Sequence, residues 1–114
     1  MTQRPAIRVA HTLSAAAEAA HAHNVTMLQV RIIAAVAAVG RSTVTEIAIA
    51  LRVSAPTVSK PSDDIVRAGF LAKSPDGRDR RKWWLTITPA GVDLISAIDH
   101  AFRVANRLNP RKAA

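Results

Sequence analysis

The chain has no cysteine among its 114 residues, which removes disulfide bonds, thiolate metal sites and cysteine-based redox sensing. Aromatic residues are almost as scarce, since two Trp and two Phe are the whole set. The longest strongly apolar run is residues 32–39, far shorter than the roughly 20 residues that cross a bilayer. We therefore expect a soluble, cytoplasmic protein with no membrane partner.

Motifs that mark enzymes are missing as well. The sequence contains no glycine-rich phosphate loop, no nucleophile elbow and no paired carboxylates with a companion histidine at a useful spacing. The histidines do not form a metal site, because His21 and His23 diverge on a helix and His11 and His100 have no acidic neighbour in sequence. We predict that the protein is not an enzyme and binds no metal or cofactor.

Positive charge is what the chain has in excess. Sixteen Lys and Arg against eight Asp and Glu give a net charge of +8 and an isoelectric point near 11.5. Residues 69–88 hold five of these cations and only two acids, the densest net charge in the chain. A concentrated basic segment favours a polyanionic partner, such as nucleic acid or an anionic membrane surface. The length suits one domain, which we assign to residues 1–114.

Residue patterns typical of helix starts and ends occur in the first half of the chain. Capping boxes at Thr26–Gln29 and Thr43–Glu46 predict two helix starts, and Ser54 caps a third helix. Gly40 and Gly69 supply the stops for the first and third of these helices. The second helix is short and is joined to the third by a tight turn, which is the helix-turn-helix arrangement.

After residue 69 the pattern changes to that of a β-hairpin. Strand candidates at 70–73 and 83–88 flank the turn sequence SPDG, and a last helix spans 89–108. A weaker, alanine-rich helix precedes the others at 6–22. The predicted fold is mainly α with a small β-hairpin: a winged helix-turn-helix with its core at 26–98, flanked by terminal dimerisation helices. Its helix-turn-helix is 43–68, and its wing is 70–88.

Four motifs in this order resemble the MarR family of bacterial winged-helix transcription regulators. The family has a TxxELA helix, a serine-rich recognition helix, a wing holding Asp-Arg-Arg and an LTxxG helix entrance. The matching segments here are Thr43 to Ala48, Ser54 to Lys60, Asp79 to Arg81 and Ile87 to Gly91. The similarity covers roughly residues 26–98, and it implies a DNA-binding regulator.

The start of the third helix and the wing are the expected DNA-binding surface. Small or polar groups on the helix suit a major groove, and wing guanidinium groups suit phosphates or a narrow minor groove. The predicted contacts are Ser54, Ala55, Pro56, Thr57, Ser59, Lys60, Arg78, Arg80, Arg81 and Lys82. As in the resembling family, Asp79 is expected to pair with Arg81 and hold the wing tip in shape.

Two adjacent tryptophans follow the basic loop. Side chains alternate along a strand, so Trp83 shares one face with Leu85 while Trp84 lies on the other. We expect one tryptophan in the core, and the resemblance implies that it is Trp83. Three roles stay open for Trp84: packing on a partner subunit, lining a ligand site, or covering the hairpin.

Pro61 departs from the resembling pattern, because it stands inside the predicted recognition helix. A proline in a helix interior costs about 3 kcal/mol or more. The segment SKPSDD also reads as a helix start of its own. We therefore expect a bend or break near Lys60, with residues 54–60 forming a short reading segment.

Apolar stripes on the terminal helices need covering, which favours a homodimer. The predicted dimer contacts are Leu13, Val92, Ile95, Ile98 and Phe102. The leading hypothesis is a homodimeric repressor that reads a pseudo-palindromic site in double-stranded DNA. One alternative is a winged-helix interaction module without sequence-specific DNA binding. A small-molecule sensor is compatible with the first hypothesis, although the sequence identifies no effector.

Overall fold

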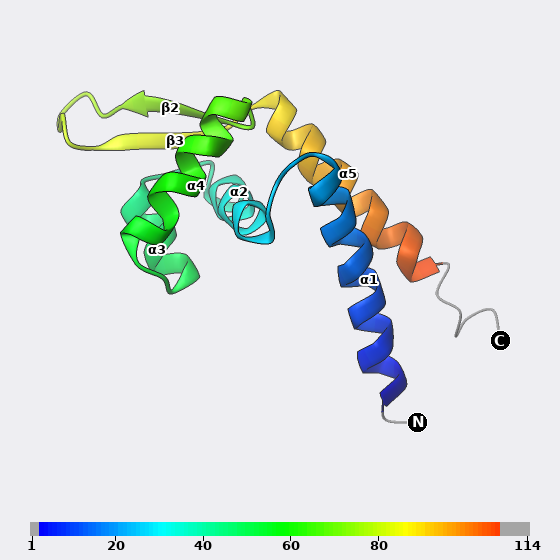
Figure 1. Ribbon diagram of the computed structural model, residues 1–114. Coiled ribbons are helices and arrows are strands. Elements are labelled where there is room, and N and C mark those ends of the chain that lie inside the picture. Colours follow the sequence, from blue (N-terminus) through cyan, green and yellow to red (C-terminus); the bar gives the residue numbers. More distant parts are fainter. Residues whose placement is uncertain (1–2, 108–114) are drawn as a thin grey trace.

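Within residues 3–107, the part of the chain that the computed structural model describes, five helices and three short strands follow one another. Their order and bounds are α1 Gln3–Ala22, α2 Met27–Val39, β1 Arg41–Ser42, α3 Val44–Leu51, α4 Ala55–Ala68, β2 Leu71–Pro75, β3 Trp83–Ile87 and α5 Pro89–Arg107. The predicted winged helix-turn-helix is confirmed (Figure 1). Helices α3 and α4 form the helix-turn-helix, and strands β2 and β3 form the wing.

Local sequence signals set the ends of the inner helices as predicted. Thr26 Oγ1 accepts the backbone N–H of Gln29 at 3.2 Å, and Gln29 Oε1 accepts that of Thr26 at 2.9 Å, so α2 begins with a capping box. Thr43 and Glu46 repeat this arrangement at the start of α3. Gly69 ends α4 with φ of 91°, a left-handed conformation that glycine adopts without steric cost.

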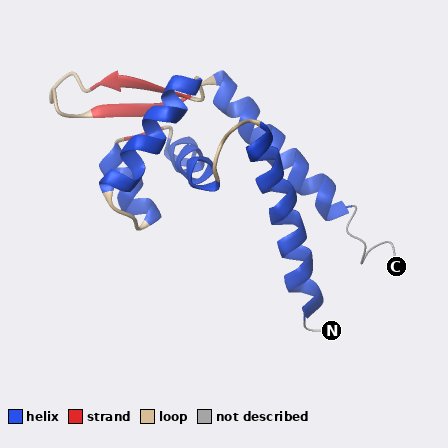
Figure 2. Ribbon diagram, viewed as in Figure 1, coloured by secondary structure: helices blue, strands red, loops and turns tan. Residues whose placement is uncertain are grey.

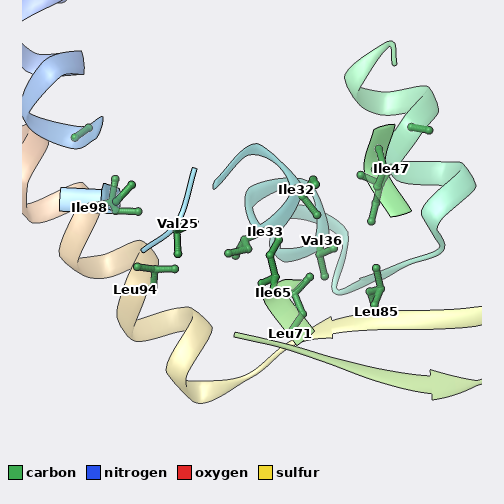
Figure 3. Close-up of a cluster of buried hydrophobic side chains, with 14 residues drawn as sticks. Val25, Ile32, Ile33, Val36, Ile47, Ile65, Leu71, Leu85, Leu94 and Ile98 are labelled. Carbon is green, nitrogen blue, oxygen red and sulfur yellow. The ribbon is translucent and has the colours of Figure 1, made fainter. Parts of the chain in front are cut away.

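The hydrophobic core is built around α2 (Figure 3). Its fully buried members include Ile32, Ile33 and Val36 of α2, Ile47 of α3, Ile65 of α4, Leu71 of β2 and Leu85 of β3. Burying one such aliphatic side chain contributes about 1.5–3 kcal/mol. The cluster therefore fixes the helix-turn-helix and the base of the wing against the same helix.

The sheet has the strand order β1-β3-β2 and is antiparallel throughout. The hairpin strands lie at 71–75 and 83–87, close to the predicted 70–73 and 83–88. Strand β1 was not predicted, because its two residues carry no pattern of their own and gain their hydrogen bonds from a strand far away in sequence. Arg41 pairs with Thr86, and Ser74 pairs with Trp84 on the other side of β3.

Helices α1 and α5 pack side by side and extend away from the winged helix as one arm (Figures 1 and 2). The structure measures 59 × 27 × 21 Å, and its radius of gyration of 16.3 Å exceeds the roughly 13 Å of a compact domain of this length. Arg8 Nε donates to Asn106 Oδ1 at 3.2 Å between the two helices. No single helix within residues 3–107 has the length and apolar character of a membrane span; α1 and α2 reach them only together, with a bend of 91° between them.

The start of α5 lies against the base of the wing. Thr88 Oγ1 donates to the Gly69 carbonyl and accepts the backbone N–H of Gly91 at 3.0 Å, so it caps α5 and ties it to the end of α4. Gly91 is buried against the Phe70 carbonyl oxygen, where a Cβ atom would overlap that oxygen and lie 2.7 Å from Cγ1 of Ile87. The approach of the two backbones therefore requires glycine.

Helix α4 runs without interruption from Ala55 to Ala68, so the predicted break near Lys60 is wrong. Pro61 lacks the N–H that would bond to the Thr57 carbonyl, but Thr57 lies on an exposed part of the helix, where water can satisfy that oxygen. Val58 and Ile65, on either side of Pro61, are both fully buried. Packing of both halves on one core holds the helix together across the proline.

Candidate nucleic-acid interface

The turn between α3 and α4 brings one end of α4 to the surface. Arg52 adopts a left-handed conformation with φ of 59°, and the backbone N–H of Val53 returns to the Ala48 carbonyl at 3.0 Å. Ser54 then caps α4, since its Oγ accepts the backbone N–H of Thr57 at 3.4 Å. The exposed residues at this end of the helix are Ser54, Pro56, Thr57, Ser59 and Lys60; Ala55 is half-buried.

Hydrogen bonds within α4 hold several of these groups in place. The hydroxyls of Ser54 and Thr57 lie 2.6 Å apart, and Ser59 Oγ donates to the Ala55 carbonyl at 3.1 Å. A hydroxyl has two lone pairs and one hydrogen, so each of these groups retains hydrogen-bonding capacity for a ligand. Lys60 Nζ lies 3.9 Å from Asp64, but its side chain is 86% exposed, and such a pair is worth little in water.

The wing turn is organised by Asp76, a residue that the sequence analysis did not select. Its Oδ1 accepts the backbone N–H groups of Arg78 at 2.7 Å and Asp79 at 3.3 Å, and its Oδ2 accepts the indole N–H of Trp84 at 3.0 Å. The backbone N–H of Arg78, followed by the Trp84 indole, holds the pKa of the Asp76 carboxyl below its ordinary value. The signal in the sequence was the Asp-Gly pair, because an aspartate before a turn commonly binds the amide two residues on.

Asp79 contacts Arg81 through the main chain. Its Oδ1 accepts the Arg81 backbone N–H at 2.9 Å, and its carbonyl accepts the N–H of Lys82 at 3.1 Å. The ion pairs found within residues 3–107 do not include a pair between the two side chains. The Arg81 guanidinium is therefore left for other partners, while the turn is closed by backbone groups.

Neither tryptophan lies in the core, so the expectation for Trp83 is wrong. The face that it shares with Leu85 is the buried one, and Leu85 is only 2% exposed, but Trp83 is 43% exposed because it lies beyond the point where the core ends. Lys73 Nζ lies over its ring at 4.9 Å. On the opposite face Trp84 is half-buried, with the Arg41 guanidinium over its ring at 4.0 Å. Each tryptophan thus holds one cation on its ring.

The inner face of the wing and the start of α3 enclose a shallow hollow. Its volume is about 350 Å³, and its lining includes Thr43, Thr45, Glu46, Lys73, Arg81, Lys82 and Trp83. Three of these side chains are cationic and one is acidic, and the Glu46 carboxylate already accepts hydrogen bonds from Thr43. The excess of cations suits an extended anionic ligand such as a nucleic acid backbone. Lys73 Nζ also lies 3.9 Å from Asp63 Oδ1 of α4, so this helix is adjacent to the inner face of the wing.

The residues predicted to form a dimer interface fall into two groups. Leu13, Val92 and Phe102 are exposed at 50%, 49% and 39%, respectively. Ile95 is half-buried, and Ile98 is buried in the chain's own core. The arm of α1 and α5 therefore keeps a free apolar surface, to which Ile98 adds little.

Known proteins share both sequence features and fold with this chain. A family model described as MarR family matches residues 23–82, more than half of the chain. The fold is similar to that of YusO from Bacillus subtilis, with a TM-score of 0.76 and 22% identity over 82% of this chain and 66% of that one. A MepR mutant of S. aureus bound to an oligodeoxyribonucleotide gives a TM-score of 0.81 and 21% identity over 94% of this chain and 80% of that one.

A mutant of E. coli MarR complexed with operator DNA also matches, with a TM-score of 0.70 and 15% identity over 88% of this chain and 71% of that one. At these levels of identity the likeness establishes the fold alone. The chain spans just under two thirds of the YusO chain and more of the other two. No curated protein matches the sequence significantly.

Proposed function

The chain belongs to the MarR family, and on this premise we propose that it is a sequence-specific DNA-binding transcription regulator that acts as a homodimeric repressor. The observation that carries the proposal is the state of the wing cations Arg78, Arg80, Arg81 and Lys82. Among residues 3–107, none of their side chains has an acidic partner or a hydrogen-bond acceptor. Unpaired cations on a projecting hairpin are what contacts with phosphate groups require.

The recognition helix supplies the other half of the argument. Thr57, Ser59 and Lys60 are exposed at the start of α4, a position from which such helices reach base edges in the major groove. Lys73 of the wing lies 3.9 Å from Asp63 of the same helix, so the wing would follow the adjacent backbone or minor groove. The MepR and MarR mutants named above are complexes with DNA, which supports the same use of the fold here.

A homodimer accounts for the free apolar surface of the α1–α5 arm. Leu13, Val92 and Phe102 are large apolar side chains with much of their surface in water, and a two-fold interface would cover them. Two symmetric copies would read a pseudo-palindromic site with half-sites centred about 10 bp apart, or a multiple of this. A repressor needs only such occupancy of its site, so no further domain is required for that role.

The experiment begins with the selection of duplexes from a random-sequence pool by the purified protein. Sedimentation of the selected complex is expected to give two chains per duplex. Affinity is then measured from 50 to 200 mM salt, across which a dimer making about 6–10 phosphate contacts should lose roughly 10³- to 10⁵-fold. Arg80→Ala combined with Arg81→Ala removes four cations per dimer, and the slope of log K against log salt should fall by about 3.6 if all four contact phosphates.

The matched control is Arg103→Ala combined with Arg107→Ala, which makes the same change in net charge on α5. This control should keep the slope of the wild type. If the pool yields no preferred sequence, the alternative of a winged-helix interaction module replaces the proposal. An unchanged slope in the wing variant would show that the wing cations do not contact DNA.

A further inference from the structure

The outer face of the wing sheet carries an arginine on a rigid platform. Arg41 belongs to β1, and its register opposite Thr86 puts it on the same side of the sheet as Trp84. Its guanidinium carbon lies 4.0 Å from the centroid of the Trp84 ring. Trp84 is fixed in turn by the bond from its indole N–H to Asp76 Oδ2 at 3.0 Å. The guanidinium of an otherwise exposed arginine is thereby held in one place.

This stacked guanidinium has no acceptor of its own. Within residues 3–107, no carboxylate or carbonyl oxygen accepts a hydrogen bond from the Arg41 side chain. By contrast, the guanidinium groups of Arg31, Arg67 and Arg103 each donate to an oxygen of the chain. Stacking uses the flat face of a guanidinium and leaves the N–H groups at its edge free, in the fork geometry that matches a phosphate.

A hollow of about 440 Å³ lies next to this arginine, and its lining residues include Arg41, Ser74, Asp76, Arg78 and Trp84. The one acid among them is already occupied: both carboxylate oxygens of Asp76 accept N–H groups from the wing turn. Its charge therefore orders the turn, and within the described residues it forms no ion pair with either guanidinium group. Two guanidinium groups and a hydroxyl remain for a ligand, which makes the hollow attractive to an anion.

We propose that Arg41, together with Arg78, forms a second phosphate-binding surface that grips the DNA backbone outside the half-site read by α4. This inference rests on the proposed function. The inner hollow, with Trp83, faces α3, whereas the hollow at Trp84 opens on the other face of the same strand. When the wing tip lies in or along a groove of the DNA, the two faces of the hairpin contact the phosphate backbones on opposite sides of that groove. The inner face then contacts the half-site, and the outer face contacts the flanking DNA.

The test uses two duplexes that share the site selected by the protein and differ only in flank length, with about 2 bp or about 12 bp on each side, so that the longer one adds one helical turn. On the long duplex, two Arg41 contacts per dimer should contribute about 1.8 to the slope of log K against log salt, in addition to what Arg78 contributes. Arg41→Ala should therefore lower the slope by about 1.8 on the long duplex and leave it unchanged on the short one. Arg41→Gln should do the same, while its planar amide still covers the tryptophan ring.

A control variant separates the contact from the general effect of charge. Arg103→Ala makes the same change in charge on α5 and should keep the slope of the wild type on both duplexes. Thermal unfolding of every variant establishes that the fold is intact before binding is compared.

Two results would overturn the inference and leave the proposed function standing. In the first, Arg41→Ala and Arg41→Gln bind both duplexes as the wild type does, so that Arg41 only covers Trp84. In the second, they lose as much on the short duplex as on the long one, which puts the contact inside the half-site. A failure of the proposed function itself would be visible earlier, as the absence of any selected duplex.

Discussion

Ser62 gives the sharpest test of how the core tolerates a polar group. It is 1% exposed on the inner side of α4, and its Oγ has no hydrogen-bond partner among residues 3–107. A buried hydroxyl without a partner costs about 1–3 kcal/mol. Ser62→Ala removes that cost, and alanine is also favoured over serine in a helix by up to about 0.5 kcal/mol. Some packing contacts of the oxygen are lost, at about 0.1–0.2 kcal/mol each. We expect a net stabilisation of about 1 kcal/mol.

The matched control is Ser59→Ala, which lies one turn earlier on the same helix. Ser59 is exposed and its hydroxyl donates to the Ala55 carbonyl, so alanine gains the same helix propensity there but removes no buried group. Thermal unfolding at equal protein concentration should place the melting temperature of Ser62→Ala about 4 °C above that of Ser59→Ala. If Ser62→Ala melts at or below the control, the reasoning is refuted, because Oγ must then bond to the Val58 carbonyl or to a buried water.

Two further predictions concern the base and the tip of the wing. Gly91→Ala should lower the free energy of unfolding by about 2 kcal/mol in chemical denaturation, because the new Cβ atom overlaps the Phe70 carbonyl. The gain in helix propensity, about 1 kcal/mol, offsets only part of that cost. Gly77→Ala is the control and should change little, since a Cβ atom there meets nothing within 4 Å. The pKa of Asp76 is lowered on folding, so its carboxylate stabilises the turn at all pH values above its ordinary pKa of 3.8 and ceases to do so as pH falls through the lower folded value. The NMR signal of the Trp84 indole N–H should therefore hold steady as pH falls from about 7 to the ordinary pKa of 3.8 and shift only below it. A similar acid shift in Asp76→Asn would contradict this cause.

Features that depend on a few neighbouring residues could be predicted from the sequence. The capping boxes at Thr26–Gln29 and Thr43–Glu46 are closed by hydrogen bonds three residues apart, so the pattern alone identifies them. The stop at Gly69 and the hairpin around the SPDG turn follow from local backbone preferences in the same way. These signals were enough to obtain the order of helices and the position of the wing.

Features that depend on distant partners could not be predicted. The alternation of side chains along a strand identified the inner face of β3, but it does not predict how far the hydrophobic core extends along that face. Trp83 lies on this face beyond the end of the core. The local cost of Pro61 suggested a break, whereas packing of α4 on α2 decides that the helix continues. Arg41 gave no signal at all, because its partner Trp84 meets it only when β1 pairs with β3.

The way in which the wing is stabilised bears directly on what it can bind. The tip projects beyond the hydrophobic core, so burial of apolar side chains cannot order it, and carboxylates paired with its arginines would order it but cancel its charge. Cations near α4 are paired in that way: Lys60 and Arg67 both lie within 4.0 Å of Asp64. At the wing, the carboxylates of Asp76 and Asp79 bind backbone N–H groups, and Asp76 also binds the Trp84 indole. The tryptophan rings hold Arg41 and Lys73 on their faces, for about 0.5–1 kcal/mol each at exposed sites. Lys73 is also paired with Asp63 of α4, but among the described residues the wing arginines have no acidic partner. The hairpin is therefore ordered while its arginines remain available for an anionic partner.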